Sequence, residues 1–202
     1  FYSGLINFKP FFLNTEINTN ELDLSYLFNS NSFFLELLKT KILDNKNLNI
    51  KIDINSKKIV RQNHLVDFFL KFKVNQGLID MNNSKINLSN YAIFKISDSL
   101  FFTDNDNIFL RGKITLNIEN LDEIYKFLQT PKKNRTAIRK LEFSFLYNVD
   151  KEKIKFHEVK INNENNEIFA NFFNKSMSGK KIFQNQIYFK NFFNEIFRFY
   201  EG

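Results

Sequence analysis

The sequence is dominated by segments in which apolar and polar residues alternate. In the stretch 108–118, which reads IFLRGKITLNI, most even positions are apolar, and the odd positions from Arg111 onward are polar. Successive side chains of a strand point to opposite faces, so this stretch predicts a strand with one apolar face and one polar face. Similar alternation occurs over 48–54, 66–74, 92–102 and 141–149. Short turns rich in Asn, Asp and Ser separate these segments, which is typical of antiparallel strands.

A few segments carry the longer period of a helix. Apolar residues recur at spacings of three and four over 21–43, where Ser32 is a candidate N-cap for the second part. A second helix is expected over 121–128, with Asn120 as its cap and acidic residues in its first turn. The apolar spacing over 192–200 predicts a third.

Three local features are expected around these elements. Residues 8–17 predict a strand entered through Pro10. Thr130 and Pro131 are expected to end the second helix or to cap a short one reaching Ile138. The apolar residues stand at even positions over 154–156 and at odd positions over 159–161. This change predicts a β-bulge near His157. Together the patterns predict a mainly β single domain over 1–202, an antiparallel, strongly curved sheet flanked by a few short helices.

Composition limits the classes of partner. The chain of 202 residues has a net charge of +7, contains 27 Phe and has no Cys, so disulfides and Cys metal sites are excluded. Phe, Asn, Lys and Ile share AT-rich codons, so we expect part of the positive charge to reflect genome bias toward Lys. Only 5 of the 29 basic residues are Arg, the residue favoured for phosphate forks, which disfavours a nucleic-acid partner.

Catalytic and metal-binding patterns are poor. His64 and His157 lie far apart in the sequence, and each is expected to be a surface or strand histidine. The run 103–107 (TDNDN) lacks the Gly and the closing Glu of a calcium loop and predicts a hairpin turn. We find neither a Gly-flanked nucleophile nor a phosphate-binding Gly loop. We therefore expect a non-enzymatic protein without a metal or cofactor.

One basic cluster stands out in the sequence between the second helix and the next strand. It is either a solvated loop or a contact for anionic head groups or another polyanion. The aromatic residues mostly share the apolar strand faces, so they do not interleave with basic residues as a base-stacking platform requires. The cluster comprises Lys132, Lys133, Arg135, Arg139 and Lys140.

The apolar strand faces together are too large to stay in water. One solution is an ordinary core, in which the helical segments, roughly 40 residues, cover about half of such a sheet by length. The other is a bent sheet whose open groove holds acyl chains. Composition does not separate these two. The candidate lipid-binding residues are Ile50, Ile52, Ile54, Phe68, Leu70, Phe72, Ile108, Leu110, Ile114, Leu116, Ile118, Phe143 and Phe145.

The order of segments resembles the AsmA-like family of bacterial envelope proteins, which is related to bridge-type lipid carriers. The resemblance is carried by FKPF at 8–11, by LRGKITLNI at 110–118 running into LDEIYKFL at 121–128, by LEFSF at 141–145 and by FRFYEG at 197–202. It implies the C-terminal portion of a longer periplasmic protein, anchored in the inner membrane by a helix upstream of Phe1. It also implies phospholipid passage toward the outer membrane.

Three other functions stay open, and the least favoured of them is a nucleic-acid binder, which a steep salt dependence of binding to unrelated DNA would support. The other two are envelope functions. The first is a structural or assembly domain of the envelope, with a dry core and protein partners but no lipid. The second is a hydrolase of envelope polymers, which would need a cleft with paired carboxylates. The sequence offers no such pair at a recognisable spacing.

Overall fold

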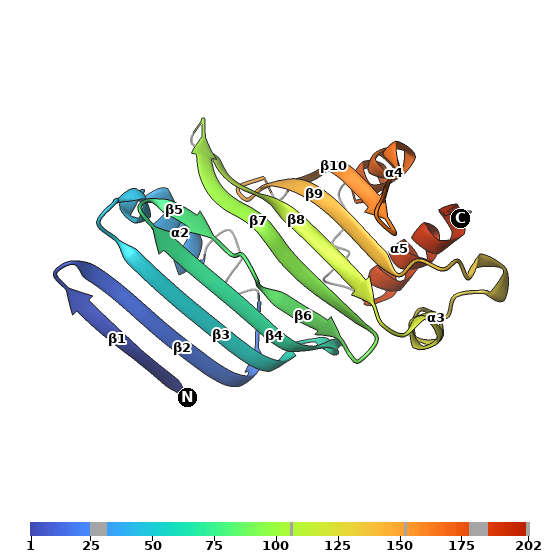
Figure 1. Ribbon diagram of the computed structural model, residues 1–202, viewed down its shortest axis with the longest axis horizontal. Coiled ribbons are helices and arrows are strands. Elements are labelled where there is room, and N and C mark those ends of the chain that lie inside the picture. Colours follow the sequence, from blue (N-terminus) through green and yellow to red (C-terminus); the bar gives the residue numbers. More distant parts are fainter. Residues whose placement is uncertain (25–31, 106, 152, 178–185, 201–202) are drawn as a thin grey trace.

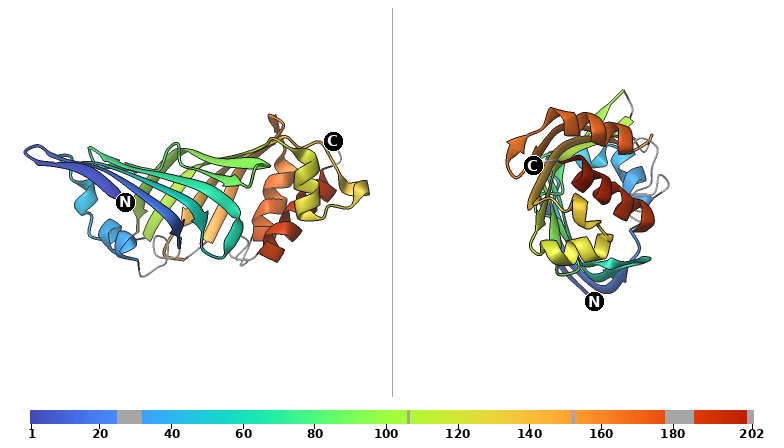
Figure 2. Two further views of the ribbon diagram at one scale, coloured as in Figure 1. Left: turned by 90° about the horizontal axis from the view of Figure 1, so that it is seen from below. Right: turned by 90° about the vertical axis from the view of Figure 1, so that its right-hand side faces the viewer.

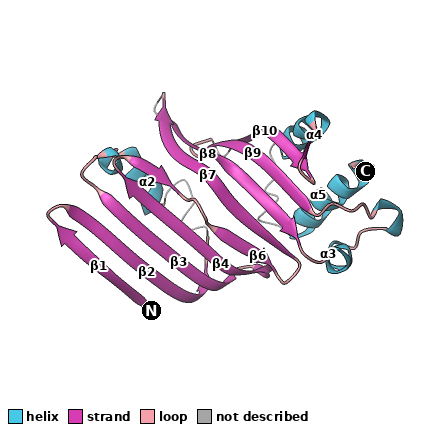
Figure 3. Ribbon diagram, in the orientation of Figure 1, coloured by secondary structure: helices cyan, strands magenta, loops and turns pink. Residues whose placement is uncertain are grey.

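The computed structural model describes residues 1–24, 32–105, 107–151, 153–177 and 186–200. Its main element is one eleven-stranded sheet in the order β1-β2-β3-β4-β5-β7-β8-β9-β10-β11, and β6 pairs with both β4 and β7 (Figures 1 and 3). The sheet is curved and mostly antiparallel, which confirms the predicted fold class. The strands are β1 (Tyr2–Phe8), β2 (Phe11–Leu22), β3 (Asn49–Ile59), β4 (Gln62–Asn75), β5 (Leu78–Asp80), β6 (Lys85–Leu88), β7 (Ala92–Asp104), β8 (Asn107–Ile118), β9 (Lys140–Asn148), β10 (Lys153–Ile161) and β11 (Glu164–Asn165).

Helices lie at the two ends of the sheet (Figure 2). Near β4 and β5 lies α2 (Phe33–Lys39), which is followed by the 3₁₀ turn η1 (Ile42–Asp44). At the other end lie α3 (Leu121–Leu128), the 3₁₀ turn η2 (Lys132–Asn134), α4 (Glu167–Met177) and α5 (Gln186–Phe199). We call the sheet face against which the helices pack, which carries Ile50, Ile52 and Ile54 of β3, the helix-side face. The opposite face, which carries Lys51 and Asp53, is the outer face.

One strand pair departs from the antiparallel pattern. Strands β2 and β3 are parallel, with Leu13 opposite Ile50 and Ile17 opposite Ile54. A parallel pair needs a long crossover between its strands, and here the connection contains α2 and η1. The helix predicted within 21–43 therefore serves as the link that lets β3 run in the same direction as β2.

Several local predictions are confirmed. The Ser32 hydroxyl caps α2 by accepting a hydrogen bond from the Leu35 amide. The Asn120 side chain caps α3 by accepting from the Glu123 amide at 3.1 Å. The β9–β10 register shifts between Phe156 and Glu158, where the bulge was expected.

Other boundaries differ from the sequence prediction. Phe8 ends β1, Lys9 and Pro10 form the turn, and β2 begins only at Phe11. Residues 21 and 22, expected to be helical, belong to β2, and 25–31 lie outside the described residues. At Thr130 and Pro131 the first of the two alternatives is confirmed, because α3 ends at Leu128 and beyond Pro131 only the single turn η2 forms, without a helix reaching Ile138.

The C-terminal helices are longer than predicted. The apolar spacing predicted a helix only over 192–200, but α4 also forms over Glu167–Met177, and α5 begins at Gln186 rather than near Phe192. The signal for α4 was present: the Asn166 side chain accepts a hydrogen bond from the Phe169 amide, and Phe169 and Phe173 are buried one turn apart. These helices bring the phenylalanines that cover one end of the sheet.

Candidate functional site

The predicted lipid-binding residues fall into two groups according to their exposure. All thirteen belong to strands whose apolar side chains mostly point to the helix-side face. Nine of them are buried in the protein's own core. Only four stay partly exposed, namely Ile52, Ile54, Phe68 and Ile114. The nine buried residues are Ile50, Leu70, Phe72, Ile108, Leu110, Leu116, Ile118, Phe143 and Phe145.

The part of the face over β7–β10 is sealed by phenylalanines from α4 and α5. Phe143 of β9 contacts Phe173 of α4, with ring centroids 5.6 Å apart. Phe94 of β7 contacts Phe189 and Phe193 of α5 at 6.4 and 6.3 Å. The cavity left among these side chains is about 10 Å³. That space is about the size of one water molecule and is too small for an acyl chain, so this part of the face is not a groove.

The far end of the face is covered by α2. The ring of Phe34 lies 5.0 Å from the ring of Phe72 and 5.9 Å from the ring of Phe101. Leu35 and Leu38 of the same helix are buried against the sheet. Phe72, a predicted lining residue, is therefore part of a dry contact.

Between these two covered regions the face carries an apolar strip that is only partly buried. Ile17 lies opposite Ile54 in the β2–β3 pairing, and Ile96 lies opposite Ile114 in the β7–β8 pairing. Strands β4 and β6 are antiparallel, and Phe69 lies opposite Lys85. The preceding residue of β4, Phe68, therefore lies opposite the following residue of β6, Ile86. We call this strip the open band. Its members are Ile17, Ile52, Ile54, Phe68, Ile86, Ile96 and Ile114, all half-buried.

The open band is long enough to hold a lipid tail. It crosses β2, β3, β4, β6, β7 and β8, which are five strand spacings of about 4.8 Å each, or roughly 24 Å. The hydrocarbon depth of one membrane leaflet is about 15 Å. The members of the open band are Ile and Phe, and the residues directly opposite three of them, Leu70, Ser56 and Phe94, are buried.

The predicted basic cluster is divided by the fold. Lys132 and Lys133 are exposed on η2. Arg135 lies with its guanidinium 5.4 Å from the centre of the Tyr125 ring, and its Nε donates to the carbonyl of Thr130. Arg139 and Lys140 lie farther along, where the chain enters β9.

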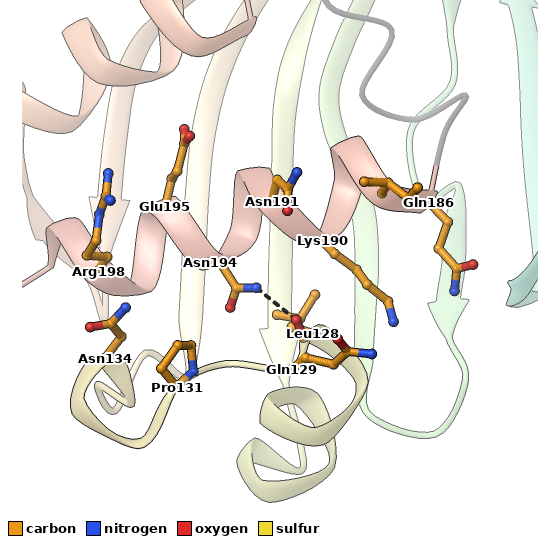
Figure 4. Close-up of a pocket in the computed structure, with 11 residues that line it drawn as sticks. Leu128, Gln129, Pro131, Asn134, Gln186, Lys190, Asn191, Asn194, Glu195 and Arg198 are labelled. Carbon is orange, nitrogen blue, oxygen red and sulfur yellow. Dashed lines mark hydrogen bonds between the residues drawn. The ribbon is translucent and has the colours of Figure 1, made fainter.

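A cleft of about 600 Å³ separates α5 from the segment 128–134 (Figure 4). Asn194 ties its two walls together: its Nδ2 donates to the Leu128 carbonyl at 2.8 Å, and its Oδ1 accepts from the Thr130 hydroxyl at 2.6 Å. Lys190 reaches from α5 toward Gln129 on the opposite wall, while Glu195 points away (Figure 4). Lys190 and Arg198 line the cleft together with Glu195, and Lys132 and Lys133 lie on the exposed turn η2 next to Pro131.

His64 is buried at the junction of β4 with α3 and α5, and His157 is exposed on β10. Burial lowers the pKa of His64 below its ordinary value of 6.5, and the Lys190 ammonium lowers it further. Both residues lie in strands, as predicted, but the burial of His64 beneath two helices was not foreseen. Within 103–107 the described residues form the hairpin between β7 and β8, and Asp106 lies outside them.

In the part of the chain that the structure describes, His, Asp and Glu do not gather in any group of three that could hold a metal ion. The described helices include none that is long and apolar enough to cross a membrane. The chain matches no protein-family model, no curated protein and no solved structure. Any functional assignment therefore rests on the chemistry of these surfaces.

Proposed function

We propose that the protein is a non-enzymatic lipid-handling module of the cell envelope, in which the open band holds acyl chains. The observation that carries this proposal is the strip of half-buried Ile and Phe side chains between the sealed ends of the helix-side face. It agrees with the role implied by the resemblance to AsmA-like proteins: phospholipid transport between the inner and outer membranes by a periplasmic body.

The mechanism is partition rather than bond making. Complete burial of one methylene group against apolar surface contributes about 0.8 kcal/mol to binding. A band that covers an acyl chain on one side only contributes less per methylene group. Ile17, Ile54 and Ile114 offer similar apolar surface along the band. An acyl chain lying there is therefore bound with a similar free energy at each position. Binding of similar strength at each step lets a tail enter, shift along the band and leave.

The cations around the cleft supply a place for the lipid phosphate. Phe94, whose cross-strand neighbour Ile86 belongs to the band, contacts Phe189 of α5. The next residue of α5, Lys190, lines the cleft. The sealed Phe94–Phe189 contact lies between the band and this cleft, whose lining cations are Lys190 and Arg198. Anionic head groups are attracted to such cations.

The proposal is tested by mass spectrometry of lipids extracted from the purified protein and two variants. Ile54→Asp places a charge in the open band and is expected to remove most of the bound lipid. Asn49→Asp adds the same charge to the exposed outer face of the same strand and should leave the lipid content unchanged. Circular dichroism checks that both variants fold. Equal lipid in Ile54→Asp and the native protein would contradict the proposal.

A second candidate is a structural or assembly domain of the envelope. The feature that favours it is the edge strand β1, whose seven residues are all exposed and carry no charge. Natural edge strands are usually protected by charges, proline or bulges, and an unprotected edge can pair with a partner strand. Native protein purified without lipid, but with a partner protein bound at β1, would favour this second function.

A further inference from the structure

A second hollow lies on the outer face, across the sheet from the open band. It measures about 610 Å³, and its lining includes Phe69, Lys85, Lys95, Thr115, Lys140 and Glu142. These residues come from β4, β6, β7, β8 and β9, so the hollow is built on paired strands rather than on loops. Side chains on strands are held more precisely than side chains on loops.

Two positive charges in this hollow are uncompensated. Lys85 and Lys95 lie directly opposite each other in the β6–β7 pairing, and both are exposed. Like charges in directly opposite positions destabilise a sheet. Neither ammonium makes an ion pair or a side-chain hydrogen bond within the described residues.

Two of the acids nearby are ion-paired, whereas Asp67 of β4 accepts a hydrogen bond from Asn87, two residues along β6 from Lys85. Glu142, the carboxylate that lines the hollow, lies 3.1 Å from the Lys140 ammonium. Asp98, at the β7 bulge, lies 3.4 Å from the ammonium of Lys113. The charge of Lys85 and Lys95 is therefore free to act on a ligand.

The donors around these lysines match the chemistry of a phosphate ester. Lys95 lies between Lys85 and Thr115 in one cross-strand row, and Asn117 lies opposite Lys140 in the next row. Neighbouring strands are about 4.8 Å apart, which lets two ammonium groups converge on one phosphate. Phe69, opposite Lys85, gives an apolar wall for the carbon part of an ester.

We propose that the outer-face hollow binds a phosphate mono- or diester between Lys85 and Lys95. This goes beyond lipid handling in the open band, because a lipid whose tails occupy the helix-side face has the sheet between it and this hollow. The two sites can therefore fail independently of each other.

The test is calorimetric binding of inorganic phosphate, glycerol 3-phosphate, and phosphatidylcholine vesicles with and without phosphatidylglycerol. The native protein is compared with a Lys85→Gln/Lys95→Gln double variant. The matched control is Lys73→Gln, which removes an outer-face lysine outside the hollow and opposite Lys51. The double variant should bind at least about tenfold more weakly than the native protein and the control, given the strength of charge-assisted hydrogen bonds.

A stability measurement separates loss of the site from loss of the fold. Removing two opposed like charges should leave the midpoint of thermal unfolding unchanged or raise it. Binding of the soluble esters alone would identify a soluble ligand, and binding of the phosphatidylglycerol vesicles alone would identify a membrane head group. The proposal is overturned if the native protein binds none of the probes, or if the double variant binds them as tightly as the native protein.

Discussion

The imidazole of His64 on β4 packs against the ring of Phe189 on α5, with centroids 5.4 Å apart. The ring of Phe127 of α3 lies at the same distance from the imidazole, and the two phenylalanine rings are 6.3 Å apart. The residue thus joins the sheet to two helices, in a place where a charged imidazolium would lose its hydration. Protonation of one side chain is therefore coupled to the docking of both helices.

We predict that the free energy of unfolding falls in mild acid because of His64. Burial, and secondarily Lys190, lower the pKa of His64 in the folded chain below 6.5, so the unfolded chain takes up the proton first. The stability is complete above pH 6.5 and is lost as the pH falls toward the lowered value, by at most about 1.4 kcal/mol per pH unit for one proton. Urea unfolding between pH 7.5 and 5 measures this slope.

Two variants assign the slope to its residue. His64→Phe should flatten the pH dependence, since an aromatic ring without a titrating group suits the contacts with Phe127 and Phe189. His157→Gln, at the exposed histidine, should keep it. A slope that survives in His64→Phe would show that another group causes it.

Truncation of the sealed and open parts of the helix-side face should have different costs. Leu116 is 1% exposed, so Leu116→Ala should destabilise by about 3 kcal/mol, the usual cost of a core cavity. Ile54 is half-buried, so Ile54→Ala should cost less than about 1.5 kcal/mol. Chemical denaturation at neutral pH gives both values. Equal costs would mean that the open band is as well covered as the core.

Asn194 is predicted to hold α5 against the end of α3. Asn194→Ala removes the hydrogen bonds to Leu128 and Thr130 and should destabilise by about 1–3 kcal/mol. Amide hydrogen exchange in α3 should increase at the same time. Asn191→Ala, at an exposed neighbouring position on the same helix, is the control and should change stability by less than about 0.5 kcal/mol. Unchanged exchange in α3 would rule out this role of Asn194.

Gly77 is required by the turn between β4 and β5. Its φ is +80°, and a Cβ atom there would lie 2.6 Å from the carbonyl oxygen of Asp44. Gly77→Ala should therefore destabilise by more than about 1 kcal/mol. Gln76→Gly, at the adjacent residue with a φ of 52°, should be neutral or stabilising because it relieves a left-handed conformation. Thermal unfolding of the two variants tests this contrast.

Strands with one buried face were predictable from the sequence. The alternation over β3, β4, β7 and β8 exists because one face of each strand meets the core. Strand β1 has no buried face at all, so its residues carry no such period. The parallel pairing of Leu13 with Ile50 depends on a long crossover, and local periodicity contains no information about it.

The functional surface was only partly predictable. Ile54 and Leu116 occupy equivalent apolar positions in alternating segments, yet Ile54 is half-buried and Leu116 is fully buried in the core. The difference arises from where distant helices dock, and the α4 helix that helps to seal the sheet was not foreseen. The pairing of Lys85 with Lys95 likewise needs the β6–β7 register, which the sequence does not display.

The most direct test of the lipid-handling account is photocrosslinking with a phospholipid whose acyl chain carries a photoreactive group. After digestion, mass spectrometry locates the labelled peptides. If acyl chains lie in the open band, label is expected on peptides that contain Ile54, Phe68 or Ile114, and unlabelled phospholipid should compete with it. Label confined to the outer face, or no more label than in unfolded protein, would contradict it.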